Sequence, residues 1–294
     1  KLRQAEKLRA WAKELNKTSI IIEALISGLI TVQEIVNVQS AVIAGDLSLD
    51  RALYKRFRAT ELKKKGSEEF EKLVTGAISG SVDTEREYSH INRVKVTDIE
   101  DFLTAQTYRP AITKAFAVVR GFAHDSLQDL SLEPIRQGAT PKFSDIGKNC
   151  LKSRQTREIC LDDVGYETVD PTDPDNSSIV RLIDGDLVIT RQGAGTVGRA
   201  SIFFGDRELY ITDSLFLVRI DKEKTDSAFI AAYLRSYTGQ RLIEKGVYGS
   251  TGQLNLGNSH VRKIPIIKLD RAVQKYFGDK VRLENLLRNY EKSL

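Results

Sequence analysis

The stretch Asp186-Leu-Val-Ile-Thr-Arg-Gln-Gly-Ala-Gly-Thr-Val-Gly-Arg-Ala-Ser-Ile-Phe-Phe204 decides the fold. Its two apolar runs, Asp186–Thr190 and Ala200–Phe204, have the length and composition of short strands. The glycines between them have the spacing GxGxxG, which in a dinucleotide-binding fold must be followed by a helix. A second strand-like run follows Gly198 instead. We therefore reject dinucleotide binding and expect these glycines to shape a tight loop.

Strand-like runs continue on both sides of this stretch, so the region from about residue 130 is predicted to be rich in sheet. A hairpin turn is expected at Gly205-Asp206. Apolar spacing predicts a helix over about Ser227–Glu244 and a closing helix from Arg271. The other predicted strands are Leu130–Arg136, Ser178–Leu182, Glu208–Ile211, Ser214–Ile220 and Lys263–Ile267.

The first 125 residues are predicted to be helical. Residues 1–30 have the periodicity of one long helix, and Thr31-Val-Gln-Glu34 is a capping box that opens a second helix through Ala44. Further helices are expected over 49–65, around Phe70 and after the capping box at Thr97, and from Pro110 to Phe122. The fold class is therefore α+β, with a helical region over 1–125, a second domain over 126–270 and a terminal helix over 271–294.

Composition limits the classes of protein to consider. The 294 residues include 45 Lys and Arg and 40 Asp and Glu, a net charge of +5 that fits a nucleic-acid partner. No apolar run is long enough for a membrane span and no signal peptide opens the sequence, so a cytoplasmic protein is expected. Its two cysteines, Cys150 and Cys160, are interpreted as reduced thiols.

A search for catalytic motifs predicts a protein that is not itself an enzyme and that uses no cofactor and no metal. Asp50 with Glu61 and Lys63 superficially resembles a nuclease motif, but these residues lie in a predicted helix and the lysine begins a charged run. We find no motif for gripping a flipped adenine, no phosphate-binding lysine loop and no nucleophile with its base.

Three glycine-containing polar loops, Gly138–Lys142, Thr190–Arg199 and Gly246–Asn255, contain the residue types that read DNA bases. Arginine suits guanine, glutamine and asparagine suit adenine, and serine and threonine suit either base. Plain solvated loops are the alternative interpretation. The candidate DNA-binding residues are Lys142, Arg191, Gln192, Thr196, Arg199, Tyr248, Ser250, Thr251, Gln253 and Asn255.

An ordered series of segments resembles the target-recognition domain of the specificity subunits of type I restriction–modification systems, over about residues 126–294. In addition, Ile22–Val32 is similar to the end of the spacer helix of that family. The segments are Gly138–Pro141, Asp184–Ile189, Gly193–Ala200, Tyr248–Asn255 and Ile264-Pro265 followed by Gln274.

The resemblance implies an α/β recognition domain with a mixed, curved sheet and long helices. It implies double-stranded DNA, an adenine methyltransferase subunit and a translocating nuclease subunit as partners, and no active site in the chain itself. The helical block from about 46 to 125 departs from the family, whose members carry two recognition domains. Three alternatives stay open: a half-subunit that forms a homodimer, the recognition part of a single-chain methyltransferase–nuclease, and a helical interaction module.

The terminal helices carry apolar stripes that are too long to bury against one small domain. In the first helix the stripe includes Leu8, Leu15, Leu25 and Leu29. In the resembled family such helices pair antiparallel. We therefore expect the terminal helices to pair with each other, with a second copy or with the methyltransferase partner.

Overall fold

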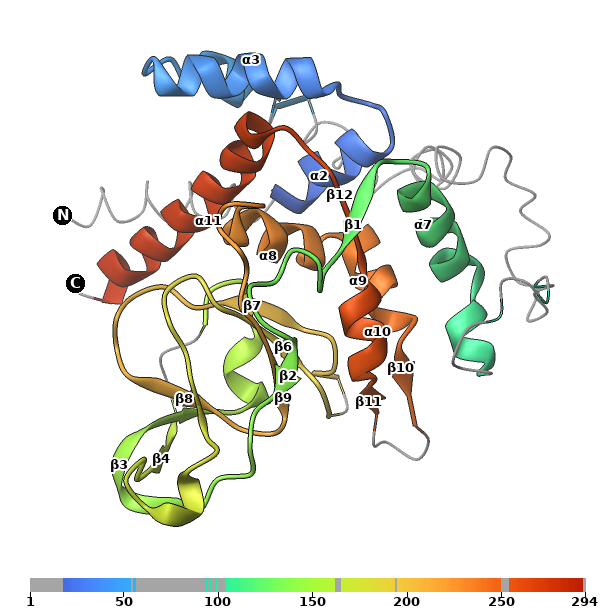
Figure 1. Cartoon of the computed structure of the whole chain (residues 1–294). Coiled ribbons are helices and arrows are strands. Elements are labelled where there is room, and N and C mark those ends of the chain that lie inside the picture. The colour runs from blue at the N-terminus through green and yellow to red at the C-terminus, as the bar shows by residue number, and fades with distance from the viewer. Residues whose placement is uncertain are drawn as a thin grey trace.

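The structure, a computed structural model, describes residues 18–53, 55–56, 94, 96, 99, 104–161, 165–193, 195–249 and 254–292. The helices predicted around Phe70 and Thr97, most of the one predicted over 49–65, and both Leu8 and Leu15 lie outside these residues. Figure 1 shows most of the helices in the upper part of the molecule and the two four-stranded sheets in the lower part. In the part described, no helix is both long enough and apolar enough to cross a membrane.

The N-terminal helices confirm the capping predictions. Helix α2 (Thr18–Ile26) ends before Gly28, which has a φ of 70°, so the helix predicted to reach residue 30 stops earlier. Helix α3 (Val32–Ile43) begins at the predicted capping box, in which the Thr31 side chain accepts from the Glu34 N–H and the Glu34 side chain accepts from the Thr31 N–H. A short helix covers residues 48–53.

Helix α7 (Pro110–Arg120) begins with its proline in the first turn, as predicted, and follows the 3₁₀ turn η2 (Ala105–Tyr108).

The central sheet has the order β2-β9-β6-β7, and all of its neighbouring strands are antiparallel. The strands are β2 (Arg136–Gln137), β6 (Leu187–Thr190), β7 (Ala200–Ile202) and β9 (Leu215–Val218). Leu187 and Ile189 belong to the hydrophobic cluster that contains the helices, whereas Val188 belongs to a second cluster with residues of the other large sheet. Both faces of β6 are therefore covered, which explains its uninterrupted apolar run.

The second sheet has the order β4-β3-β8-β5 and mixes strand directions, since β3 and β8 are parallel. This mixture, together with the helices, confirms the predicted α+β class. The strands are β3 (Phe143–Leu151), β4 (Glu167–Val169), β5 (Val180–Arg181) and β8 (Leu209–Ile211).

The prediction of a hairpin at Gly205-Asp206 is wrong, because β7 and β8 belong to different sheets. The free edge of β7 is occupied by residues 159–161: the Ile202 N–H donates to the Ile159 oxygen at 2.7 Å, and the Leu161 N–H donates to the Ile202 oxygen at 3.3 Å. The chain still turns at Gly205, which has a φ of 113°, but β8 continues between β3 and β5.

The predicted helix over 227–244 is two helices, α8 (Ser227–Arg235) and α9 (Tyr237–Glu244). The buried Ser236 separates them: it has an extended ψ of 164°, and its hydroxyl accepts from the Gly239 N–H at 3.0 Å. The predicted strand over Leu130–Arg136 is mostly irregular: Ser131 forms an isolated bridge with Ile220, and only Arg136 lies in β2.

The remaining elements complete the layer of helices. Strands β1 (His124–Ser126) and β12 (Pro265–Ile267) pair, as do β10 (Val247–Tyr248) and β11 (Asn255–Leu256). Helix α10 is Asn258–Lys263. Helix α11 (Arg271–Lys292) confirms the predicted closing helix and packs on α8 and α3. One cluster of buried apolar side chains joins α2, α7, α8, α9 and α11 to the central sheet.

Candidate nucleic-acid interface

One end of the central sheet collects loops from three parts of the chain. In the antiparallel register, Gln137 at the end of β2 faces Phe216, Thr190 at the end of β6 faces Leu215, and Ala200 at the start of β7 faces Ile189. Residues 138–142, 191–199 and 212–214 therefore begin or finish at the same end of the sheet. Two of the three loops predicted to contact DNA are among them.

Backbone hydrogen bonds join these loops through the turn 212–214. The Gly138 N–H donates to the Leu215 oxygen at 3.0 Å, and the Arg191 N–H donates to the Ser214 oxygen at 2.8 Å. A side chain at Gly138 would stand 2.5 Å from the Thr212 oxygen, which explains why a glycine is needed at this close approach.

The loop after β6 turns at Gly193, Gly195 and Gly198, whose φ angles are 123°, 71° and 79°. It leads into a strand, β7, and this supports the rejection of a dinucleotide site.

The third predicted loop joins the other two through the hairpin β10–β11. Asn255 of β11 faces Tyr248 of β10 on one side and Gln192 on the other. The Gly193 N–H donates to the Leu254 oxygen at 3.1 Å, and the Leu256 N–H donates to the Arg191 oxygen at 2.7 Å. This pattern makes Gln192 and Asn255 a non-hydrogen-bonded pair, the kind in which opposite side chains are closest.

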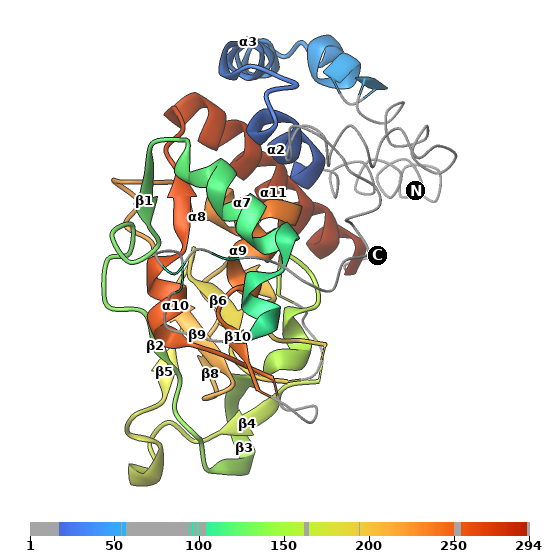
Figure 2. The ribbon, with the colours of Figure 1, turned by 90° about the vertical axis from the view of Figure 1, so that its right-hand side faces the viewer.

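Directly opposed residues of antiparallel strands project from the same face. Tyr248, Asn255 and Gln192 therefore form one line of side chains across three strands, which we call the polar row. The Tyr248 side chain is 41% exposed. Figure 2 shows β10 on the face of the molecule that also carries α7.

The two predicted arginines lie beside the polar row and are oriented by hydrogen bonds. Arg191 donates from Nε to the Asp213 oxygen at 3.0 Å and from Nη2 to Gln192 Oε1 at 3.0 Å. Arg199 donates from Nη2 to the Gly195 oxygen at 2.6 Å. Thr196, which is half-buried, donates its hydroxyl to the Gln192 backbone oxygen at 3.4 Å. Six of the ten predicted residues are thus brought together around one loop and one hairpin.

The other predicted residues stand apart. Lys142 comes directly before β3, the strand of the second sheet that is drawn at the bottom of Figure 1. Its Nζ is 2.9 Å from Asp175 and 3.1 Å from Asp173, and these contacts raise the pKa of Lys142. Its role in DNA binding stays a prediction. Ser250, Thr251 and Gln253, between β10 and β11, lie outside the described residues.

Basic residues that the sequence analysis did not select lie beside β7. Thr156, in the 3₁₀ turn η3 (Ser153–Thr156), exchanges a hydrogen bond of 2.8 Å with Thr190 of β6. The next residue, Arg157, is exposed, and its backbone oxygen accepts from Arg235 at 2.8 Å. Burial lowers the pKa of Arg235, the charge of Glu158 opposes this shift, and the charge of Arg199 adds to it. The basic run Lys152-Ser-Arg-Gln-Thr-Arg157 was the sequence signal for Arg157.

Cysteine and aspartate side chains outside the interface, which could have catalytic potential, are held in the core or between helices. Cys150 and Cys160 are buried and unpaired, and burial raises the pKa of each thiol to about 12. Asp50 lies in a helix, as predicted, and accepts from Lys280 Nζ at 2.8 Å and from the Tyr276 hydroxyl at 2.9 Å. This carboxylate links the helix over 48–53 to α11.

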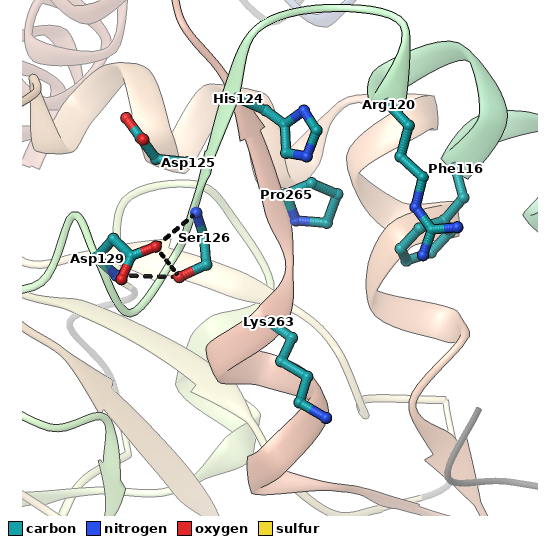
Figure 3. A pocket seen from close by; sticks show the side chains of 8 residues that line it. All are labelled: Phe116, Arg120, His124, Asp125, Ser126, Asp129, Lys263 and Pro265. Atoms are coloured by element: carbon teal, nitrogen blue, oxygen red, sulfur yellow. Dashed lines mark hydrogen bonds between the residues drawn. The ribbon is translucent and has the colours of Figure 1, made fainter.

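A separate polar cavity of about 350 Å³ lies between α7, β1 and the end of α10 (Figure 3). Asp129 on its wall accepts from the Ser126 hydroxyl at 2.6 Å and from the Ser126 N–H at 3.3 Å, which lowers the pKa of that carboxyl. The cavity has cations and carboxylates on its wall, so its charge favours no single class of ligand. The lining residues are Phe116, Arg120, His124, Asp125, Ser126, Asp129, Lys263 and Pro265.

No protein-family model and no curated protein matches the sequence. Among solved structures, the chain is similar to the S subunit of a type I restriction–modification system from M. genitalium. The identity is 13% and the TM-score 0.37, over 58% of this chain and 39% of that chain. This subunit is of the family that the ordered segments resemble.

Two further structures are similar to this chain. A structure from a study of complex assembly and conformational transition of the type I R-M system has 13% identity and a TM-score of 0.38, over 82% of this chain and 51% of that chain. The type IIG restriction endonuclease BpuSI has 9% identity and a TM-score of 0.47, over 60% of this chain and 28% of that chain. At most about half of each of the three matched chains is covered.

Proposed function

We propose that the chain reads DNA sequence as the specificity subunit of a restriction–modification system and directs a partner adenine methyltransferase and nuclease. One observation carries the proposal: loops from three parts of the chain meet at one end of the central sheet, where the polar row lies beside Arg191 and Arg199. This is the set of residue types that recognise base edges and phosphates.

The shape of this region also supports DNA as the ligand. The major groove of B-DNA admits a two-stranded β-ribbon, and several sequence-specific proteins bind with such a ribbon. The hairpin β10–β11, extended by residues 191–193, is a ribbon of this kind, with the partly exposed Tyr248 at its outer edge. Arg199 and Arg157 lie beside β7 and supply positive charge for the phosphates.

The proposal assigns the chemistry to partner subunits. The groups of the candidate interface are amides, hydroxyls and guanidiniums. Such groups donate and accept hydrogen bonds at neutral pH but are poor proton carriers unless their pKa values are strongly shifted. A binding role suits them better than acid–base catalysis.

A binding titration of the full chain with duplex DNA at several salt concentrations tests the proposal. We expect the logarithm of the binding constant to fall linearly with the logarithm of salt, with a slope of about −0.9 for each phosphate contacted. Arg191→Ala is expected to weaken binding by about 1–3 kcal/mol and to relax the preference at one base pair. Binding that is weak, independent of salt and unchanged by Arg191→Ala would contradict the proposal.

The alternative that residues 1–125 contain the catalytic part of a single-chain modification enzyme predicts a different result. The pure chain is incubated with DNA and S-adenosylmethionine, and methyl transfer is measured. We expect none from a recognition subunit. Methyl transfer by the pure chain would favour the single-chain enzyme.

We also propose that the terminal helices bind partner subunits or a second copy, and that the chain divides at about residues 125 and 270. Two side chains near the end of α11 support the binding role of this helix, since Leu286 is 63% exposed and Tyr290 is 45% exposed. Leu25 is buried against the same core as α8, so it is not available to a partner. The test is therefore Leu286→Ser with Tyr290→Ser, which should abolish methyltransferase binding without changing the free energy of unfolding by more than about 0.5 kcal/mol. Unchanged partner binding would contradict this assignment.

A further inference from the structure

The amide of Gln192 has a fixed orientation because of its neighbour. Arg191 Nη2 lies 3.0 Å from Gln192 Oε1, and Arg191 Nε lies 3.0 Å from the Asp213 oxygen. A guanidinium has five N–H donors and no acceptor, so the amide atom that faces it must be the oxygen. The Asp213 bond in turn fixes the plane of the guanidinium.

The hydrogen-bonding capacity that remains is almost entirely donor capacity. Gln192 keeps both N–H groups of Nε2, because its oxygen is the atom that meets Arg191. Arg191 uses Nε and one N–H of Nη2, so about three of its five donors remain. None of these remaining donors meets an acceptor among the residues described in the structure.

We infer that Arg191 and Gln192 act together as a donor-only reader of guanine in the major groove. This inference rests on the proposed DNA-reading function and specifies one base of its target. The major-groove edge of guanine carries two neighbouring acceptors, N7 and O6, whereas adenine combines the acceptor N7 with an amino donor. The amino group of adenine would lie against the guanidinium. The general match of glutamine with adenine is therefore disfavoured for Gln192, because one lone pair of its oxygen already accepts from Arg191 and the guanidinium stands where the adenine amino group would have to approach.

Selection of binding sites from a random duplex library by the full chain, followed by base replacement in the selected site, tests this inference. We expect one invariant guanine whose replacement by 7-deazaguanine, which lacks the N7 acceptor, weakens binding about tenfold. Replacement of the same guanine by inosine keeps N7 and O6 and removes only the minor-groove amino group, so it should leave affinity unchanged. An inosine effect as large as the deaza effect would overturn the inference.

Variants of Gln192 connect that guanine to this side chain. Gln192→Met removes the amide donors without adding charge, and Gln192→Glu keeps the oxygen that accepts from Arg191. Both should abolish discrimination at the single guanine position and retain it elsewhere in the site. Gln33→Glu, on the exposed face of α3, is the control for the charge change and should retain all preferences.

The possible results separate the inference from the function on which it rests. An adenine preference that depends on Gln192, or an equal loss of affinity for all sequences in Gln192→Met, overturns the guanine assignment and leaves DNA reading intact. Failure of the wild-type chain to bind or enrich any duplex overturns both.

Discussion

At the scale of single residues, Asp186 is a buried charge that depends on its partners. Its side chain is 1% exposed and accepts from Arg219 Nε at 2.9 Å and Nη2 at 2.8 Å, and from the Ile183 N–H at 2.8 Å. These bonds to Asp186 raise the pKa of Arg219. Loss of one partner of a buried pair leaves the other charge uncompensated.

Asp186→Ala is therefore expected to lower the free energy of unfolding by about 3–5 kcal/mol, measured by urea denaturation. Lys222→Ala is the control, because this side chain is 66% exposed and lies 3.6 Å from Asp184. Loss of that surface pair should cost no more than about 1 kcal/mol. Equal effects of the two variants would show that burial of the Asp186 pair has no energetic importance.

Glu23 makes stability depend on pH. Burial raises the pKa of this carboxyl, although hydrogen bonds of 2.8 Å from the Thr238 N–H and hydroxyl partly oppose the shift. A raised pKa means that the folded state holds the proton more tightly than the unfolded state. The stabilisation from Glu23 is thus fully present below the ordinary pKa and is lost as pH rises through the folded-state pKa.

We expect Glu23→Gln, which cannot ionise, to gain stability relative to the wild type as pH rises above about 4.5. Urea denaturation of both proteins between about pH 4 and pH 8 measures the difference. A difference that stays constant across this range would mean that the pKa of Glu23 is not raised in the folded state.

At the scale of elements, Ser236 determines that two helices form where one is expected. Its hydroxyl caps α9 by accepting from the Gly239 N–H. Ser236→Ala should lower the free energy of unfolding by about 1 kcal/mol, the usual effect of losing an N-cap. Ser259→Ala is the matched control, since this serine is exposed in α10, and it should have almost no effect. Urea denaturation of both variants measures the two free energies of unfolding, and equal values would contradict the capping role of Ser236.

Elements with strong local signals were predictable from the sequence. The capping box before α3, the proline that opens α7 and the apolar run of β6 all depend on nearby residues. The pairing of β7 was not predictable, because its edge is occupied by residues 159–161, about forty residues earlier in the chain. Strand β3 was missed because most of its side chains are exposed, so it lacks an apolar run.

The candidate site shows the same division between local and long-range information. Residue types in loops make Arg191, Gln192 and Asn255 candidates from the sequence alone. That Gln192 and Asn255 oppose each other depends on the pairing of residues more than sixty positions apart. Arg157 was not selected because its place beside β7 comes from the pairing of Cys160 with Ile202.

At the scale of the whole molecule, the net charge of +5 is useful for DNA binding only where it is concentrated. If Arg157 and Arg199 contact phosphates, Arg157→Ala and Arg199→Ala should each reduce the magnitude of the salt slope by about 1 and weaken binding similarly for all sequences. Arg51→Ala removes the same charge from the exposed face of the helix over 48–53 and should leave the slope unchanged. If all three variants have the same salt slope, neither Arg157 nor Arg199 contacts a phosphate.

The polar row has a consequence for how new specificities could be engineered. Main-chain bonds between Gly193 and Leu254 and between Arg191 and Leu256 hold its strands in register, and they do not depend on the side chains at 192, 248 and 255. These three positions are therefore exchangeable without dismantling the ribbon. A library randomised at them would explore many target sequences on an unchanged scaffold, and under the proposed function each new protein would direct the same partner enzymes to a different site in a genome.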